Sequence, residues 1–138
     1  MLLQGAAALS FANFVEEIPC FAGGSVRNHL VHIIGVEQFW IYALQDIPWK
    51  PWAREDYASV DQLAAAKNRV AEETIAYVNA LTGDQLNTDL TVRPQEWPGP
   101  LRSPAYILHH IVTHSFHHKG QVASMLRYLG ENPPDTDL

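Results

Sequence analysis

Histidines are the residues of this sequence whose type and spacing suggest chemistry. Five of the seven lie in one stretch, "HHIVTHSFHHKGQV", residues 109–122. Within it His114 and His118 are four positions apart, so on a helix their rings lie on the same face and can converge on one ion. Imidazole nitrogen is a common ligand of zinc, nickel and other divalent metals. The spacing therefore indicates a candidate metal site.

The helix that must carry these histidines has clear start and stop signals. "RSPAYIL" places Ser103 at the N-cap and Pro104 at the first helical position. The helical pattern continues to Gly130, ahead of two prolines. At 3.6 residues per turn, an apolar set falls within roughly 60° of arc and predicts the buried face: Ile107, Ile111, Val122, Met125 and Leu129.

Only two of the five histidines are expected to face the core. On the same helical wheel His118 falls inside the apolar arc and His114 lies at its margin. His110 and His117 lie progressively further out, and His109 sits near the opposite side. These three are expected at the surface or beside a ligand.

The other two histidines, His29 and His32, share an earlier predicted helix. "GGSVRN" offers Ser25 as its N-cap, and the pattern runs through "HLVHIIGVEQFWIYALQD" until Pro48. One ligand from this helix and two from the later one would make a three-histidine site with at least one position open to water or substrate. The wheel places His29 nearer the core centre than His32, by roughly 60°.

A purely structural role is the alternative for each histidine. A single histidine on an apolar face is usually a core residue with a hydrogen-bond partner. Two inward imidazoles side by side would need separate partners, whereas one metal ion satisfies both. Cys20, the single cysteine, is either an inert thiol or a fourth ligand that would close the site, and we favour the first interpretation.

Two more helices complete the predicted architecture. "MLLQGAAALSFANFVEEI" resembles a secretory signal but lacks its basic region and continues into two glutamates, so we expect a first amphipathic helix. "ASVDQL" is a capping box of Ser59 and Gln62, which starts a helix that runs to Leu81, where Gly83 is placed to end it. Four helices in 138 residues predict an all-α, four-helix bundle forming a single domain, residues 1–138.

Two irregular stretches rich in proline and tryptophan, "IPWKPWARED" and "TGDQLNTDLTVRPQEWPGPLRS", separate the helices. The strand-like piece "DLTVR" lies too close to prolines to predict a sheet. Such long loops often cover a functional site, although Trp49, Trp52 and Trp97 can equally cap the ends of the core.

Composition excludes several classes of function. The formal net charge of −6 argues against binding to nucleic acid. No uninterrupted apolar run reaches the roughly 18 residues of a membrane span, so none is predicted. A single cysteine permits no intrachain disulfide, which is compatible with a reducing compartment, and we expect a cytoplasmic protein.

The sequence resembles the DinB/YfiT-like family of metal-binding four-helix bundles. The specific part is the last-helix pattern H-x-x-x-H-[RK]-G-Q, which is matched here from His114 to Gln121, with Lys119 where arginine is more usual. The histidine that this family carries in its second helix, ahead of a glutamate and a tryptophan, is matched by His32, with Glu37 and Trp40 following. The closing "PPDTDL" is also similar to the usual ending.

The resemblance implies a divalent metal, commonly zinc or nickel, held by three histidines in an open pocket. It thereby favours His32 over His29 as the third ligand beside His114 and His118. It also implies a small-molecule substrate and, often, a homodimer. Some members of the family are S-transferases or isomerases that use a low-molecular-weight thiol as cosubstrate.

Two functions from different classes follow. The first is a metal-dependent enzyme, a thiol-dependent S-transferase or a hydrolase. A hydrolase would need a general base, and Glu37 is the closest candidate, although it is equally well an ion-pair or hydrogen-bond partner. Thiol activation by a metal needs no such base, which favours transfer. The second function is a binding or assembly role for a bundle whose metal is structural or incidental.

Overall fold

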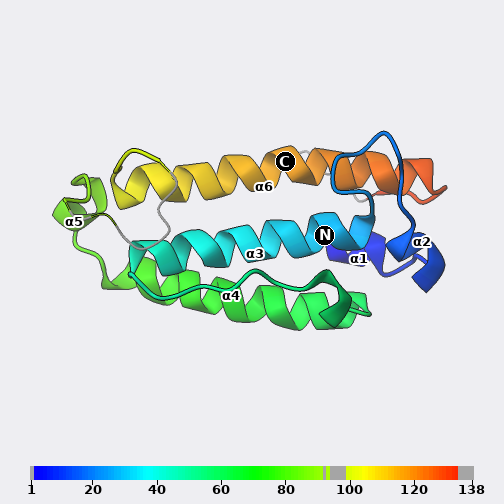
Figure 1. Cartoon of the computed structure of the whole chain (residues 1–138), viewed down its shortest axis with the longest axis horizontal. Coiled ribbons are helices and arrows are strands. Elements are labelled where there is room, and N and C mark those ends of the chain that lie inside the picture. Colours follow the sequence, from blue (N-terminus) through cyan, green and yellow to red (C-terminus); the bar gives the residue numbers. More distant parts are fainter. Residues whose placement is uncertain (1, 92, 94–98, 134–138) are drawn as a thin grey trace.

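Three long helices form the body of the molecule. The computed structural model describes residues 2–91, 93 and 99–133. Helix α3 (Val26–Leu44) packs against both α4 (Val60–Ala80) and α6 (Pro104–Tyr128), as Figure 1 shows. In this part of the chain no strand forms, so the all-α prediction is confirmed.

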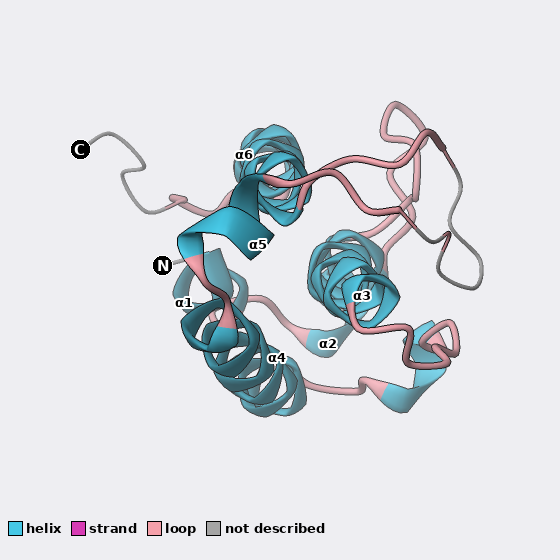
Figure 2. Ribbon diagram, turned by 90° about the vertical axis from the view of Figure 1, so that its left-hand side faces the viewer, coloured by secondary structure: helices cyan, strands magenta, loops and turns pink. Residues whose placement is uncertain are grey.

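The fourth position of the bundle is taken by short helices. Helix α1 (Leu2–Ala6) contacts α4 and α6, and α2 (Phe11–Val15) contacts α3. The end view of Figure 2 places α1 between α4 and α6. The prediction of a single N-terminal helix was therefore wrong. Ser10 adopts an extended conformation and caps α2 by accepting a hydrogen bond from the Asn13 amide, which breaks the helix in two.

The predicted starts of the three long helices are confirmed by their caps. The Ser25 hydroxyl accepts a hydrogen bond from the Asn28 amide, and the Ser103 hydroxyl accepts one from the Tyr106 amide. Ser59 and Gln62 form the reciprocal capping box at the start of α4. These bonds satisfy amide groups that otherwise have no partner in the first turn of a helix.

Gly83 does not end α4, contrary to the prediction. The helix stops at Ala80, and Leu81 is already extended, with ψ 139°. Gly83 is instead the first residue of α5 (Gly83–Asn87), which a second capping box of Thr82 and Gln85 starts. A glycine beside a strong N-cap begins a helix as readily as it ends one.

In the described part of the chain, two apolar clusters make up the core. The larger lies where α1, α2 and the first halves of α3 and α4 meet the end of α6, and the smaller lies at the opposite end of α3. Four residues of the stripe predicted on α6 are buried, and the fifth, Leu129, is half-buried. Among the described residues, no helix combines the length and the apolar character that crossing a membrane requires.

The tryptophan-rich segment after α3 is held against the bundle. It contains a short 3-10 helix, η1 (Arg54–Asp56), and runs back along the α3 and α4 side of the molecule (Figure 1). The Trp52 indole N–H donates a hydrogen bond to the Gln38 side-chain oxygen of α3 at 2.8 Å. Gln38 in turn donates to Glu73 of α4 at 3.1 Å. Trp97 and Val92 of the second irregular stretch lie outside the described residues.

Candidate metal centre

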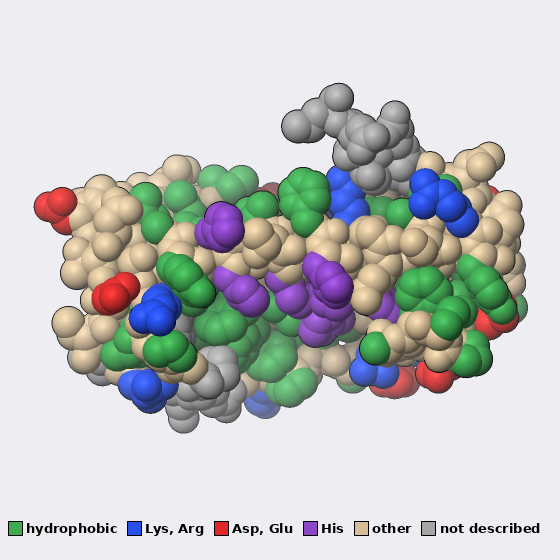
Figure 3. Space-filling view, turned by 90° about the horizontal axis from the view of Figure 1, so that it is seen from above, with side chains coloured by type: hydrophobic (Ala, Val, Ile, Leu, Met, Phe, Trp, Pro, Cys, Tyr) green, Lys and Arg blue, Asp and Glu red, His purple; other side chains and the backbone are tan. Residues whose placement is uncertain are grey.

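The structure brings His32 of α3 together with His114 and His118 of α6. One ring nitrogen of each lies within 4.8 Å of the others. The Nε2 atoms of His32 and His114 are 3.1 Å apart. Figure 3 shows histidine side chains gathered near the middle of the face that α6 presents. This seam between two helices is where the sequence places a three-histidine site.

The donor set fits a divalent metal. Three imidazoles are suitable ligands for zinc or nickel. For a tetrahedral zinc with Zn–N bonds of ~2.0–2.1 Å, two ligand nitrogens are separated by about 3.3 Å, close to the 3.1 Å between His32 and His114. Within the described part of the chain no fourth histidine, cysteine or carboxylate joins the group.

The electrostatics of the cluster keep the imidazoles neutral. Burial is the largest cause and lowers the pKa of all three, and neighbouring histidines lower it further, whereas the hydrogen bond to Gln121 opposes the lowering of the His118 pKa. The effect is largest at His114, whose pKa falls to about 4 because burial adds to the proximity of His118 and His32. Neutral rings have their lone pairs available, so a metal ion need not displace protons at neutral pH.

Gln121 orients one of the ligands. Its side-chain oxygen lies 2.6 Å from His118 Nδ1, which is therefore the protonated nitrogen. That tautomer leaves Nε2 of His118 as the free donor. Partners of this kind fix the ring orientation of metal ligands and raise their basicity. The glutamine of the family motif thus has a physical role that spacing did not reveal.

His29 is the buried histidine of α3, as the helical wheel predicts. It is 2% exposed, and its Nδ1 donates to the Ser25 carbonyl oxygen at 3.1 Å. Its Nε2 is buried and has no hydrogen-bond partner among the described residues. The ring packs 5.8 Å from that of His118 but is not part of the three-histidine group. His109, His110 and His117 are exposed.

Glu37 and Cys20 also lie outside the group. The Glu37 carboxylate accepts a hydrogen bond from the Thr74 hydroxyl of α4 at 2.8 Å, so it faces α4 rather than the histidine group. This contact favours the partner role over that of a general base. Cys20 is exposed.

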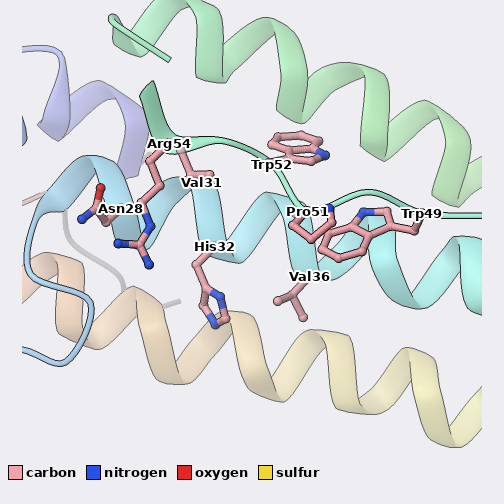
Figure 4. A pocket seen from close by; sticks show the side chains of 9 residues that line it. Asn28, Val31, His32, Val36, Trp49, Pro51, Trp52 and Arg54 are labelled. Carbon is pink, nitrogen blue, oxygen red and sulfur yellow. The ribbon is translucent and has the colours of Figure 1, made fainter. Parts of the chain in front are cut away.

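A cavity of about 170 Å³ adjoins the cluster, and His32 is one of its lining residues. Trp49, Trp52 and Arg54 line its other side, as Figure 4 shows. In the sequence, only the high tryptophan content of the segment after α3 indicated that this cavity exists. Arg54 carried no signal of its own, because its place depends on the path of an irregular segment.

Comparisons with known proteins agree with this architecture. The chain is 34% identical over 113 residues to the uncharacterized protein YizA of Bacillus subtilis (strain 168), which covers 80% of this chain and 70% of that protein. The crystal structure of a DinB-like protein from Bacillus cereus ATCC 10987 superimposes with a TM-score of 0.76 at 16% identity, covering 99% of this chain and 88% of the other. The family model described as DinB family matches residues 2–138. The chain therefore belongs to the DinB family.

Proposed function

We propose that this protein binds one divalent metal ion, zinc or nickel, through His32, His114 and His118, and uses it to catalyse a reaction of a small molecule. The convergence of three neutral imidazole nitrogens within 4.8 Å is the observation that carries the proposal. Membership of the DinB family supports it. When bound, the ion would supply a Lewis acid and a ligand position for a thiol or other donor.

An open, catalytic site is favoured over a structural one. Structural zinc sites are closed by four protein ligands, whereas catalytic sites keep three and an open position. The histidine cluster offers three in the described residues, and a cavity borders one of them. A small molecule can therefore approach His32 from the side of Trp49 and Trp52.

Thiol-dependent transfer is favoured over hydrolysis. Hydrolysis depends on a general base placed to take a proton from water. Glu37, the candidate from the sequence, is engaged by Thr74 on the α4 side of α3. The three imidazoles are themselves neutral and available to hold an ion rather than a proton. A low-molecular-weight thiol is then the cosubstrate that this site suits best.

Elemental analysis of the untagged protein, purified without added metal, tests the proposal. We expect about one divalent ion per chain, lost in His114→Ala and in His118→Ala. His109→Ala is the matched control, because His109 is exposed on the same helix and outside the cluster. No metal in the wild type even after reconstitution, or equal retention in His118→Ala and His109→Ala, would overturn the ligand set.

Cobalt substitution tests the open position. Added thiol should produce thiolate-to-cobalt charge-transfer absorption in the wild type and none in His118→Ala. A cobalt spectrum that no thiol alters would favour the structural metal instead.

The homodimer and the cytoplasmic location stay predictions. Size-exclusion chromatography with light scattering tests the homodimer.

A further inference from the structure

The cavity beside His32 has the size of a single small ligand. It lies between α3 and the segment of residues 49–54, and its volume is about 170 Å³. An apolar cavity of ~150 Å³ is large enough to admit benzene. The space therefore suits a molecule of about one ring or a short branched chain, with one end at His32 (Figure 4).

The two tryptophans that form the apolar part of this cavity wall are held in place by their neighbours. Trp52 is held by its hydrogen bond to Gln38 and by stacking on Tyr57, with the ring planes 21° apart. Trp52 also packs against α3 at Gly35, where a Cβ would lie in ordinary van der Waals contact with the indole, at 3.7 Å. Trp49 packs edge to face against Phe39, with ring centroids 5.2 Å apart. Walls fixed in this way lower the entropic cost of binding a flat or branched apolar group.

Arg54 gives the cavity its charge. It is the cation among the described lining residues, and no carboxylate lies among them. In Figure 4 its guanidinium lies on the same side of α3 as the His32 ring. Arg54 therefore supplies the positive charge of the lining in a chain of net charge −6, although Glu55 and Asp56 follow it in η1 and do not line the cavity.

We propose that the cavity binds a small carboxylate: its carboxylate pairs with Arg54, its apolar body lies against Trp49 and Trp52, and its reactive end reaches His32. The planar guanidinium matches a carboxylate in a two-pronged arrangement, which makes arginine the preferred cation for this group. This inference rests on the proposed function, because it takes the three-histidine cluster as the place of reaction. It adds the substrate class to that function.

Binding of benzoate, compared with the neutral isostere benzamide, tests the inference. Both fit the cavity by size, and dissociation constants can be followed by tryptophan fluorescence and checked by ligand-observed NMR. We expect benzoate to bind the metal-free wild type about fivefold more tightly than benzamide, which is the upper end of the range for an exposed ion pair. Arg54→Gln should abolish this preference, and Arg54→Lys should keep part of it.

The matched control is Arg127→Gln, which removes an exposed arginine from α6 that does not line the cavity. It should keep the full preference. Thermal unfolding of each variant verifies folding, and Arg54 is exposed, so little stability depends on it. An unchanged preference in Arg54→Gln, or none in the wild type, would overturn the inference.

Repeating the titrations with zinc-loaded protein separates this inference from the proposed function. A preference for benzoate that appears only with zinc and survives Arg54→Gln means that the carboxylate contacts the ion rather than Arg54, and it overturns the inference while the metal site stands. A preference that depends on Arg54 in a protein that binds no zinc supports the carboxylate cavity and refutes the metal site.

Discussion

Replacing Gln121 by alanine should weaken metal binding without removing a ligand. The Gln121 oxygen accepts the Nδ1–H of His118 at 2.6 Å. When Nε2 holds a dication, this N–H becomes more positive and the hydrogen bond acquires charge-assisted character, worth ~1.5–3 kcal/mol. Removing such a partner typically lowers metal affinity about 10- to 100-fold. Gln121 is only partly buried, so water replaces part of the interaction and we expect about tenfold.

Competition for zinc with a chromophoric chelator at pH 7.5 measures this effect. Ser124→Ala is the control: Ser124 lies about one turn further along α6, is exposed, and bonds only to the Gly120 carbonyl among the described residues. It should match the wild type. A dissociation constant for Gln121→Ala within twofold of the wild type would refute the reasoning, because the tautomer of His118 would then not depend on Gln121.

Two further predictions concern the histidines themselves. The metal-free protein should lose stability as pH falls from about 7 to 4. The pKa of His114 is about 4 in the folded chain and 6.5 in an unfolded chain. The unfolded chain therefore binds the proton at a higher pH than the folded chain, and protonation favours unfolding. Allowing for the exposure of its side chain, His114 accounts for about 1–2 kcal/mol of this loss of stability. Urea unfolding in the presence of a chelator should show that His114→Gln removes this part of the pH dependence. A free energy of unfolding that rises toward pH 4 would contradict the lowered pKa of His114. His29→Ala should cost about 2–4 kcal/mol, because His29 is 2% exposed and hydrogen-bonded, yet retain the metal. His32→Ala should instead lose the metal at little cost in stability. If His29→Ala loses the metal and His32→Ala keeps it, His29 is the ligand.

The helix starts were predictable because their signals are local. Ser25, Ser59 and Ser103 each accept a hydrogen bond from the amide three residues on, so the sequence within one turn contains both partners. The break at Ser10 and the role of Gly83 were not predictable in this way. Ser10 lies in an apolar stretch that also suits one continuous helix. Gly83 is a stop signal for the preceding helix, yet it stands inside the capping box of Thr82 and Gln85 that starts the next one. In such cases packing decides between two locally acceptable structures.

The candidate site was predictable only in part, and the helical wheel explains why. Periodicity correctly placed His29 nearer the core than His32 on α3, and on α6 His114 and His118 are half-buried while the other three histidines are exposed. The helical wheel could not select His32, because it shows only how closely each residue faces the centre of the core. A ligand site shared by two helices forms at the seam between them, away from that centre. The position of Arg54 could not be predicted for a different reason. Arg54 lies in an irregular segment, where no helical or strand period relates the sequence position of a residue to the direction of its side chain.

The two proposals share one electrostatic basis, and this makes them mutually informative. Three neutral imidazoles leave the charge of a bound dication uncompensated, and Arg54 adds a further positive charge at the adjoining cavity. A site of this kind stabilises anions, whether a thiolate at the histidines or a carboxylate at Arg54. The lining residues described include no acid that would compete with a bound anion for Arg54. Selection for anions should therefore strengthen when zinc is loaded and weaken, without vanishing, when Arg54 alone is neutralised in the loaded protein.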